Sequence, residues 1–357
     1  MSWMHIRDLP LTNLEFDLIW MKNISVLLTN GFTLHLKKKV KRLVMDFQKY
    51  LRAVRNDKVY SFPPLCDTFK RLHYCRSLIA LELNSVNISG DVVEYFIASC
   101  PSLRQLSVEY SESMVDVKVS GESLCLEYLK MALCFNLESI YISAANLSSF
   151  EYIGPAVEIT FANVPNLVEL SFQGRYSEYI IRNFPQLSNF AFQLVTLKLV
   201  VMHLEVKKKP RKFPLLAHLK NFELSAYGSE DESLLAFAPL IEAAPSLVRF
   251  ALDFHWFEDT RRKRKQKKIP KCLHHCLKEV ELAGFVGQAI DMEFAIYLFE
   301  NAIALEKIII DPLHSFWTSY PPDEKLKEIQ TIKKQVMELK SEFSLGDRLK
   351  LRNFFDV

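Results

Sequence analysis

One hydrophobic pattern recurs along the chain: an apolar residue, two variable residues, an apolar residue, one variable residue and an apolar residue. It begins eleven times, at Val40, Leu78, Leu103, Leu126, Leu147, Leu167, Leu194, Leu219, Leu247, Leu277 and Leu305. Because its last two apolar positions are two residues apart, they point to the same face of a short β-strand. The pattern therefore predicts one strand per repeat, with one buried face and one open face.

The spacing of the pattern indicates how these strands assemble. After a first interval of 38 residues, the intervals run from 20 to 30 residues. Intervals of roughly 20 to 29 residues are typical of leucine-rich repeats, whose stacked units share one continuous core. We therefore predict an α/β leucine-rich-repeat solenoid that is curved, with a mostly parallel sheet on the concave face and helices and loops on the convex face.

The longer repeats contain helix signals after the strand. Asp91, Glu232 and Asp291 each precede an apolar stretch with helical spacing, so helices are expected there. The shorter repeats between Leu126 and Leu187 have room only for loops or single turns. Near the C-terminus, Asp323 follows two prolines and predicts the start of an amphipathic helix that runs to about Ser341.

Composition excludes several classes of protein. The 357 residues include only 9 glycines, which argues against glycine-rich phosphate-binding loops. The 7 cysteines are odd in number and widely spread, which favours reduced thiols over a disulfide framework. There is no apolar run of eighteen residues, so no membrane span is expected.

The positive charge is concentrated in one segment. Formal net charge is +3, although seven positive residues lie between residues 261 and 268. The rest of the chain is mildly acidic, unlike the distributed basic stripe of a nucleic-acid-binding protein, so nucleic-acid binding is not expected. The run is interpreted as a nuclear-import signal or a phosphate-binding patch, and the alternative is a solvated loop. Its charged members are Arg261, Arg262, Lys263, Arg264, Lys265, Lys267 and Lys268.

No catalytic or cofactor site is predicted. The nucleophile-elbow, zinc-protease, Walker and dinucleotide-binding motifs are absent from the sequence. Cys272-Leu-His-His-Cys276 has the composition of a metal site, but a second Cys/His pair at suitable spacing is missing nearby. These side chains are therefore interpreted as structural or exposed, and the protein as a non-enzyme without cofactor or metal.

The segment Leu277 to Pro312 resembles the FBD-type C-terminal module of plant F-box/leucine-rich-repeat proteins. The features in common are LKEVEL, the GFVG turn from Gly284 to Gly287, Glu293, the YLFENA segment from Tyr297 and LEKIII. The middle repeats, such as CPSLRQLSV from Cys100, are also similar to repeats of that family. The resemblance extends over roughly residues 40–312.

The resemblance implies a protein-recognition function. Proteins of this family are substrate receptors of SCF-type ubiquitin ligases, in which an F-box docks on a Skp-type adaptor and the repeats hold a protein substrate. Here Leu9-Pro10-Leu11 is the only segment that resembles part of an F-box, and no SRRW-like segment follows. We therefore expect the chain to start after the F-box, with adaptor binding only if an F-box is supplied upstream.

The resemblance and the repeats together divide the chain into four parts. Residues 1–70 are an irregular N-terminal segment with the first repeat, and residues 71–276 are leucine-rich repeats. Residues 277–312 are FBD-like final repeats, and residues 313–357 are a C-terminal capping helix and tail. The alternatives for function are a small-ligand, hormone-like receptor on the solenoid and a free-standing interaction scaffold or decoy. The expected location is the nucleus, the cytoplasm or both.

The open-face positions of the predicted strands are rich in acidic residues. From Leu78 onward they include nine acids against four bases, Lys130, Lys198, Arg249 and Lys307. Such a face favours a protein partner with a basic segment, and the alternative is an ordinary solvated surface. The predicted partner-binding residues are Glu82, Glu109, Glu151, Glu169, Glu223, Asp253, Glu279, Glu281 and Asp311.

Overall fold

The structure, a computed structural model, describes residues 5–6, 13–17, 40–47, 60–62, 75–121, 123–202, 213–228, 233–256, 271–313 and 323–352. The chain divides into two compact units, Met1–Glu169 and Leu170–Val357. Each unit contains a run of neighbouring, mostly parallel strands and a buried apolar core. Among the described residues, no helix combines the length and the apolar character needed to cross a membrane. The basic run from Arg261 to Lys268 lies outside the described residues.

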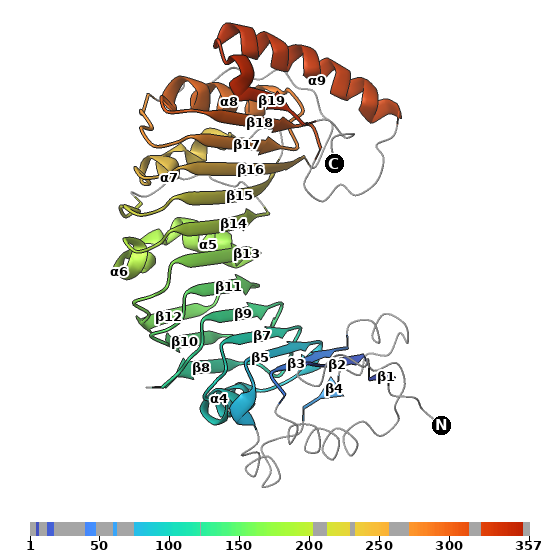
Figure 1. The fold of residues 1–357 in the computed structure, drawn as a ribbon, viewed down its shortest axis with the longest axis vertical. Helices are drawn as coiled ribbons and strands as arrows, with labels where there is room; N and C mark the ends of the chain where they lie inside the picture. The colour runs from blue at the N-terminus through green and yellow to red at the C-terminus, as the bar shows by residue number, and fades with distance from the viewer. Residues whose placement is uncertain are drawn as a thin grey trace. The chain divides into compact units, whose positions relative to one another are not determined.

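In the first unit, seven strands lie side by side in chain order (Figure 1). All neighbours pair in parallel except the first two, which are antiparallel. The strands are β1 (His5–Ile6), β2 (Asn13–Asp17), β3 (Arg42–Asp46), β5 (Ala80–Asn84), β7 (Gln105–Glu109), β9 (Tyr128–Ala132) and β11 (Ser149–Ile153).

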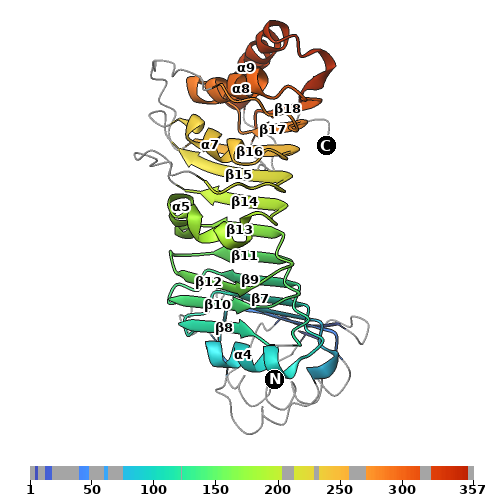
Figure 2. The ribbon, with the colours of Figure 1, turned by 90° about the vertical axis from the view of Figure 1, so that its left-hand side faces the viewer.

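A second, parallel sheet of three strands occupies the return segments of this unit (Figure 2). It consists of β8 (Asp116–Ser120), β10 (Ser139–Ser143) and β12 (Glu158–Asn163), and helix α4 (Gly90–Ser99) packs against β8. The prediction of loops or single turns in the short repeats was therefore wrong for β10 and β12. The signal was the alternation in SIYIS, whose Ile140 and Ile142 are buried.

Shorter elements complete the first unit. Strand β4 (Tyr60–Ser61) pairs in parallel with β6 (Val86–Asn87), and the 3-10 helix η1 covers Cys75–Ser77. Asparagines in successive turns connect one repeat to the previous one. The side-chain amides of Asn136, Asn146 and Asn166 donate hydrogen bonds to backbone carbonyls 21 to 24 residues earlier in the chain. These bonds satisfy backbone groups that no strand can pair.

In the second unit, the strands again follow chain order, and every pair with a printed register is parallel. Strand β13 begins at the boundary between the units. The strands are β13 (Glu169–Gln173), β14 (Thr196–Val201), β15 (Asn221–Gly228), β16 (Arg249–Trp256), β17 (Glu279–Ala283), β18 (Lys307–Asp311) and β19 (Leu349–Leu351).

Helices connect most strands of the second unit. They are α5 (Arg175–Arg182), η2 (Phe184–Leu187), α6 (Ser188–Ala191), η3 (Leu234–Phe237), α7 (Ala238–Glu242), α8 (Ala289–Asn301), α9 (Asp323–Glu342) and η4 (Gly346–Arg348). Helix α5 corrects a second part of the short-repeat prediction, because it fits between two strands where only a turn was expected. The helices expected after Asp91 and Asp291 are α4 and α8, and the one after Glu232 is split into η3 and α7.

The repeated pattern coincides with the strands. In all eleven repeats the strand begins two residues after the first apolar residue, as β7 at Gln105 follows Leu103. The second and fourth residues of these strands are buried, and the first, third and fifth remain partly exposed in most of them. In the second unit, Phe222 and Phe250 on adjacent strands contact each other, and Phe250 contacts Phe294 of α8. The expected α/β leucine-rich-repeat fold is confirmed by these elements.

The GFVG turn shapes the connection between β17 and α8. Gly284 and Gly287 have positive φ angles of 68° and 74°, which favour glycine. The carboxylate of Asp291 accepts hydrogen bonds from the backbone amides of Val286 and Gly287 at 2.7 and 2.8 Å. A side chain at Gly287 would collide with Gln335 of α9, whose amide donates to the Gly287 carbonyl. The turn therefore lets α9 approach the end of the unit closely.

Candidate functional site

The open face of the sheet is defined here by the first, third and fifth residues of each strand, whose side chains lie opposite the buried core. All nine acids predicted to bind a partner occupy such positions. The structure therefore places them on one side of the strands within each unit, as the register predicted. Their participation in partner binding stays a prediction.

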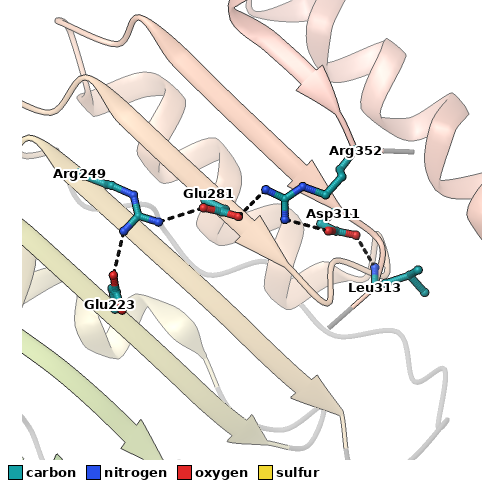
Figure 3. A network of polar contacts seen from close by, with 6 residues as sticks. All are labelled: Glu223, Arg249, Glu281, Asp311, Leu313 and Arg352. Carbon is teal, nitrogen blue, oxygen red and sulfur yellow. Dashed lines mark hydrogen bonds and ion pairs between the residues drawn. The ribbon is translucent and has the colours of Figure 1, made fainter. Parts of the chain in front are cut away.

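Ion pairs connect five side chains across β15 to β19 (Figure 3). Arg249 contacts Glu223 at 2.9 Å and Glu281 at 3.0 Å. Arg352 contacts the other oxygen of Glu281 at 2.9 Å and Asp311 at 3.2 Å. Each guanidinium thus bridges two carboxylates, and Glu281 is shared by both arginines. We call this cluster the five-residue network.

The pKa shifts in the network follow from this geometry. Burial lowers the pKa of Arg249, but hydrogen bonds and attraction from Glu223 and Glu281 outweigh it, so the pKa is raised above the usual value. Burial raises the pKa of Asp311, although Arg352 and the backbone amide of Leu313, which donates at 2.9 Å, act in the opposite direction. The ion pairs hold the five side chains in place relative to one another.

Arg352 is a site residue that the repeat pattern missed. It directly follows β19, a three-residue strand that pairs with β18 beyond the last full repeat. Its backbone amide donates to the carbonyl of Ile310, which continues the pairing by one residue. The sequence signal was the short alternation in Leu349-Lys350-Leu351-Arg352, which is too brief to identify a strand by itself.

Arginines and lysines also balance acids in the first unit. Nζ of Lys130 on β9 lies 2.8 Å from Glu109 and 3.9 Å from Glu151, and the Tyr128 hydroxyl donates to Glu151 at 2.9 Å. Burial lowers the pKa of Lys130, but Glu109 and Glu151 raise it to a greater extent. On β3, Arg42 pairs with Glu82 of β5 at 2.6 Å.

The count of nine acids against four bases left out further charged residues on the open-face side of the strands. They include Arg42 and Asp46, the first and fifth residues of β3. Lys350 and Arg352 lie on the same side, because Lys350 pairs with Ile309 of β18 and Arg352 contacts Asp311. Six of the nine acids form ion pairs with Arg42, Lys130, Arg249 or Arg352. They are Glu82, Glu109, Glu151, Glu223, Glu281 and Asp311. These ion pairs fix charged side chains of the open face relative to the neighbouring strands.

An aromatic pair lies beside Asp253 at the end of β15 and β16. Tyr227 and His255 are in register, and their rings stack with centroids 4.3 Å apart and an interplanar angle of 10°. Nε2 of His255 lies 3.3 Å from Oδ2 of Asp253. Burial and the charge of Asp253 raise the pKa of Tyr227. We refer to Tyr227, His255 and Asp253 as the ring–acid cluster.

The segment from Cys272 to Cys276 has a structural arrangement. His274 is buried, and its Nε2 lies 2.8 Å from the hydroxyl of Tyr297 on α8. The side chain of Asn301 accepts a hydrogen bond from the backbone amide of Cys272 at 2.7 Å. Burial, with a smaller contribution from His275, lowers the pKa of His274. In the described part of the chain, no three His, Cys, Asp or Glu side chains are placed to hold a metal ion.

Comparison with known proteins agrees with this fold. The family model that matches residues 58–344 is described as At1g61320/AtMIF1, LRR domain. The F-box/FBD/LRR-repeat protein At1g13570 of Arabidopsis thaliana is 24% identical over 265 residues, which cover 68% of this chain and 56% of that protein. The FBD-associated F-box protein At5g60610 of the same plant is 23% identical over 273 residues, covering 66% of this chain and 69% of that protein.

The putative FBD-associated F-box protein At1g61330, also of Arabidopsis thaliana, is 21% identical over 340 residues, covering 83% of this chain and 74% of that protein. The chain spans little more than half the length of the first relative, At1g13570. The resemblance drawn from the residues between Leu277 and Pro312 is confirmed by these matches. Because the family model covers most of its length, the chain belongs to the At1g61320/AtMIF1 leucine-rich-repeat family, with relatives among the F-box/FBD/LRR proteins of plants.

Proposed function

We propose that this chain is a non-catalytic protein-recognition module that holds a protein partner against the open face. The observation that carries the proposal is the five-residue network. Its charged side chains are partly exposed, yet each is fixed by an ion pair to a neighbouring strand. Side chains that are already ordered lose less conformational entropy when a partner binds, which supports recognition by this surface.

The finer part of the proposal concerns the ubiquitin system. The names of all three relatives include the F-box. We infer that the repeats correspond to the substrate-binding half of an SCF-type ligase receptor, and that the Skp-type adaptor binds only when an F-box is present upstream. A pull-down of the adaptor by the chain, alone and fused to an F-box, tests this. Capture only by the fusion is expected, and capture by neither would leave a free-standing interaction scaffold.

The partner surface is tested by one charge reversal with a matched control. Glu279 occupies the first open-face position of β17 and is partly exposed. Glu306 has a more exposed side chain and pairs with Lys278 just before β18, outside the strand. Partners captured from plant extract by the native chain are expected to be lost with Glu279→Lys and retained with Glu306→Lys. Equal retention by both variants would contradict binding at the open face.

A nuclear or cytoplasmic location is part of the same proposal. The run from Arg261 to Lys268 is the candidate import signal, and it carries seven positive charges. Fusion of this run to a cytosolic reporter is expected to move the reporter into the nucleus. An unchanged distribution would remove the import function and leave the run as a solvated loop.

A further inference from the structure

Large apolar side chains lie exposed along one edge of the second unit. This is the edge at which the parallel strands β14 to β18 begin (Figure 1). In the loops before β14 and β18, Phe192 and Ile303 are 56% and 58% exposed. In the loops before β15 and β17, Leu215 and Leu273 are 64% and 47% exposed. We call these four residues the apolar row. Apolar side chains that gather on one surface, unlike single scattered ones, mark an interaction site.

Backbone hydrogen bonds hold these loops in a stack. Bonds of 2.8 to 2.9 Å extend the strand pairing to the residues directly before the strands, Val195, Lys220, Val248, Lys278 and Glu306. Further out, the amide of Leu216 donates to the carbonyl of Ala243, and the amide of His274 donates to the carbonyl of Asn301, both at 2.8 Å. The residue before each of these two donors is a leucine of the apolar row. The two leucines therefore occupy equivalent places in their repeats.

Phe192 and Ile303 occupy the same position of a recurring turn. The backbone amide of the buried leucine two residues later, Leu194 or Leu305, donates to the carbonyl of the residue just before the turn position, at 3.4 and 3.3 Å. Proline is favoured at this second position of a turn. In other repeats the same turn forms with proline or alanine there, at Pro101, Ala145, Pro165, Ala217 and Pro245. The turn therefore does not need a large apolar side chain, and folding alone does not account for these two.

The apolar row is symmetric along the edge. From β14 to β18 the loops present a turn residue, a loop leucine, Pro245, a second loop leucine and a second turn residue. A two-fold axis through Pro245 would bring Phe192 of one copy to Ile303 of another. The same axis would bring Leu215 to Leu273. An interface between two identical copies needs this self-complementarity, because each of its contacts occurs twice.

We propose that the apolar row is the surface through which two copies of this chain bind each other, with their rows antiparallel about a two-fold axis at Pro245. The charges beside the row are compatible with this arrangement. Lys220 of one copy lies opposite Lys278 of the other, whose charge Glu306 already neutralises at 2.7 Å. The row lies in the loops before the strands, whereas the open face belongs to the strands themselves. The inference therefore goes beyond the proposed function and does not depend on it.

Sedimentation velocity of the full chain at increasing concentration tests self-association. The mass is expected to rise from that of one chain to that of two. Phe192→Glu and Ile303→Lys should each raise the dissociation constant by about tenfold or more, because each places a charge against an apolar side chain. Met337→Glu is the matched control, because Met337 is 63% exposed on α9, outside the row, and this variant should dimerise normally. A native chain that stays monomeric at about 100 μM would overturn the proposal.

Mixing two variants tests which residues meet across the axis. Chains with Phe192→Glu and chains with Ile303→Lys are expected to form a mixed dimer, because glutamate meets lysine at one contact and the native pair remains at the other. Leu215→Glu, whose counterpart is Leu273, should not be rescued by Ile303→Lys. Rescue of both mixtures, or of neither, would contradict the antiparallel arrangement.

A different occupant of the row gives a different result. If the chain is monomeric at every concentration while Phe192→Glu and Leu273→Glu lose partners captured from plant extract, the row binds another protein and self-association is wrong. If the row variants abolish the dimer while only Glu279→Lys reduces partner capture, the row joins two copies and the open face binds the partner. Loss of the dimer with no open-face effect on capture would leave the self-association correct and the proposed partner surface wrong.

Discussion

The carboxylate of Glu281 on the open face is shared by two arginines. Its two oxygens contact Arg249 of β16 and Arg352 beside β19, 2.9 to 3.0 Å away. An ion pair at a partly exposed position contributes little to stability, about 0 to 1 kcal/mol. When two cations share one anion, however, the loss of the first leaves the anion paired, and only the loss of both leaves it alone.

A double-mutant cycle is expected to detect this sharing. Arg249→Gln and Arg352→Gln should each lower the free energy of unfolding by about 0.5 kcal/mol, and the double variant by more than their sum. Urea unfolding at low and high salt measures the coupling, which salt should weaken. As a control, Arg104→Gln breaks a pair with Glu127 in the first unit and should combine additively with Arg352→Gln. Additivity of the two network arginines would contradict a shared Glu281.

His274 makes the stability of the second unit depend on pH. Burial lowers its pKa, so the folded protein disfavours the charged imidazole. The unfolded chain takes up this proton as the pH falls below about 6.5, and the folded chain does so only at lower pH. The free energy of unfolding is therefore expected to fall as the pH is lowered through this range. His274→Gln should flatten that part of the profile, whereas His275→Gln, which removes only the smaller of the two causes of the His274 shift, should leave most of it in place.

At the scale of elements, the sequence predicted the strands far better than the segments that connect them. The eleven strands were visible because each repeats the same buried pair, such as Leu106 and Val108 of β7. The strands β10 and β12 were missed because their return segments were judged by length, although SIYIS and the first four residues of EITFAN alternate polar and apolar residues. Arg352 was missed because β19 has only three residues. The ring–acid cluster depends on strand length and register, which appear only in the folded chain.

Helix α9 was predicted from its amphipathic pattern, and its packing gives a sharp stability test. Leu339 is buried at 2% exposure, whereas Met337 on the same helix is 63% exposed. Leu339→Ala is expected to lower the free energy of unfolding by about 2 to 5 kcal/mol, because it opens a cavity. Met337→Ala should change it by less than about 0.5 kcal/mol. Chemical denaturation measures both, and similar values for the two would mean that α9 does not pack as the structure shows.

At the scale of the whole molecule, each repeat is bonded mainly to the repeats before and after it. Strand β15, for example, pairs with β14 and β16. In such an architecture the free energy of unfolding is approximately the sum of the contributions of the individual repeats and of the contacts between neighbouring repeats. A destabilising substitution in one repeat should therefore lower the stability of the neighbouring repeats most and that of distant repeats least.

Hydrogen exchange is expected to reveal this local response. Phe222 is fully buried on β15, and Phe222→Ala should raise amide exchange in β14, β15 and β16 well before β5 and β7. Phe150→Ala, which removes a buried ring from β11, is the matched substitution in the first unit. It should raise amide exchange in that unit, including in the paired strand β9. A uniform rise over both units from either variant would show that the chain opens as one cooperative body, because nearest-neighbour stacking alone predicts a graded response along the strands.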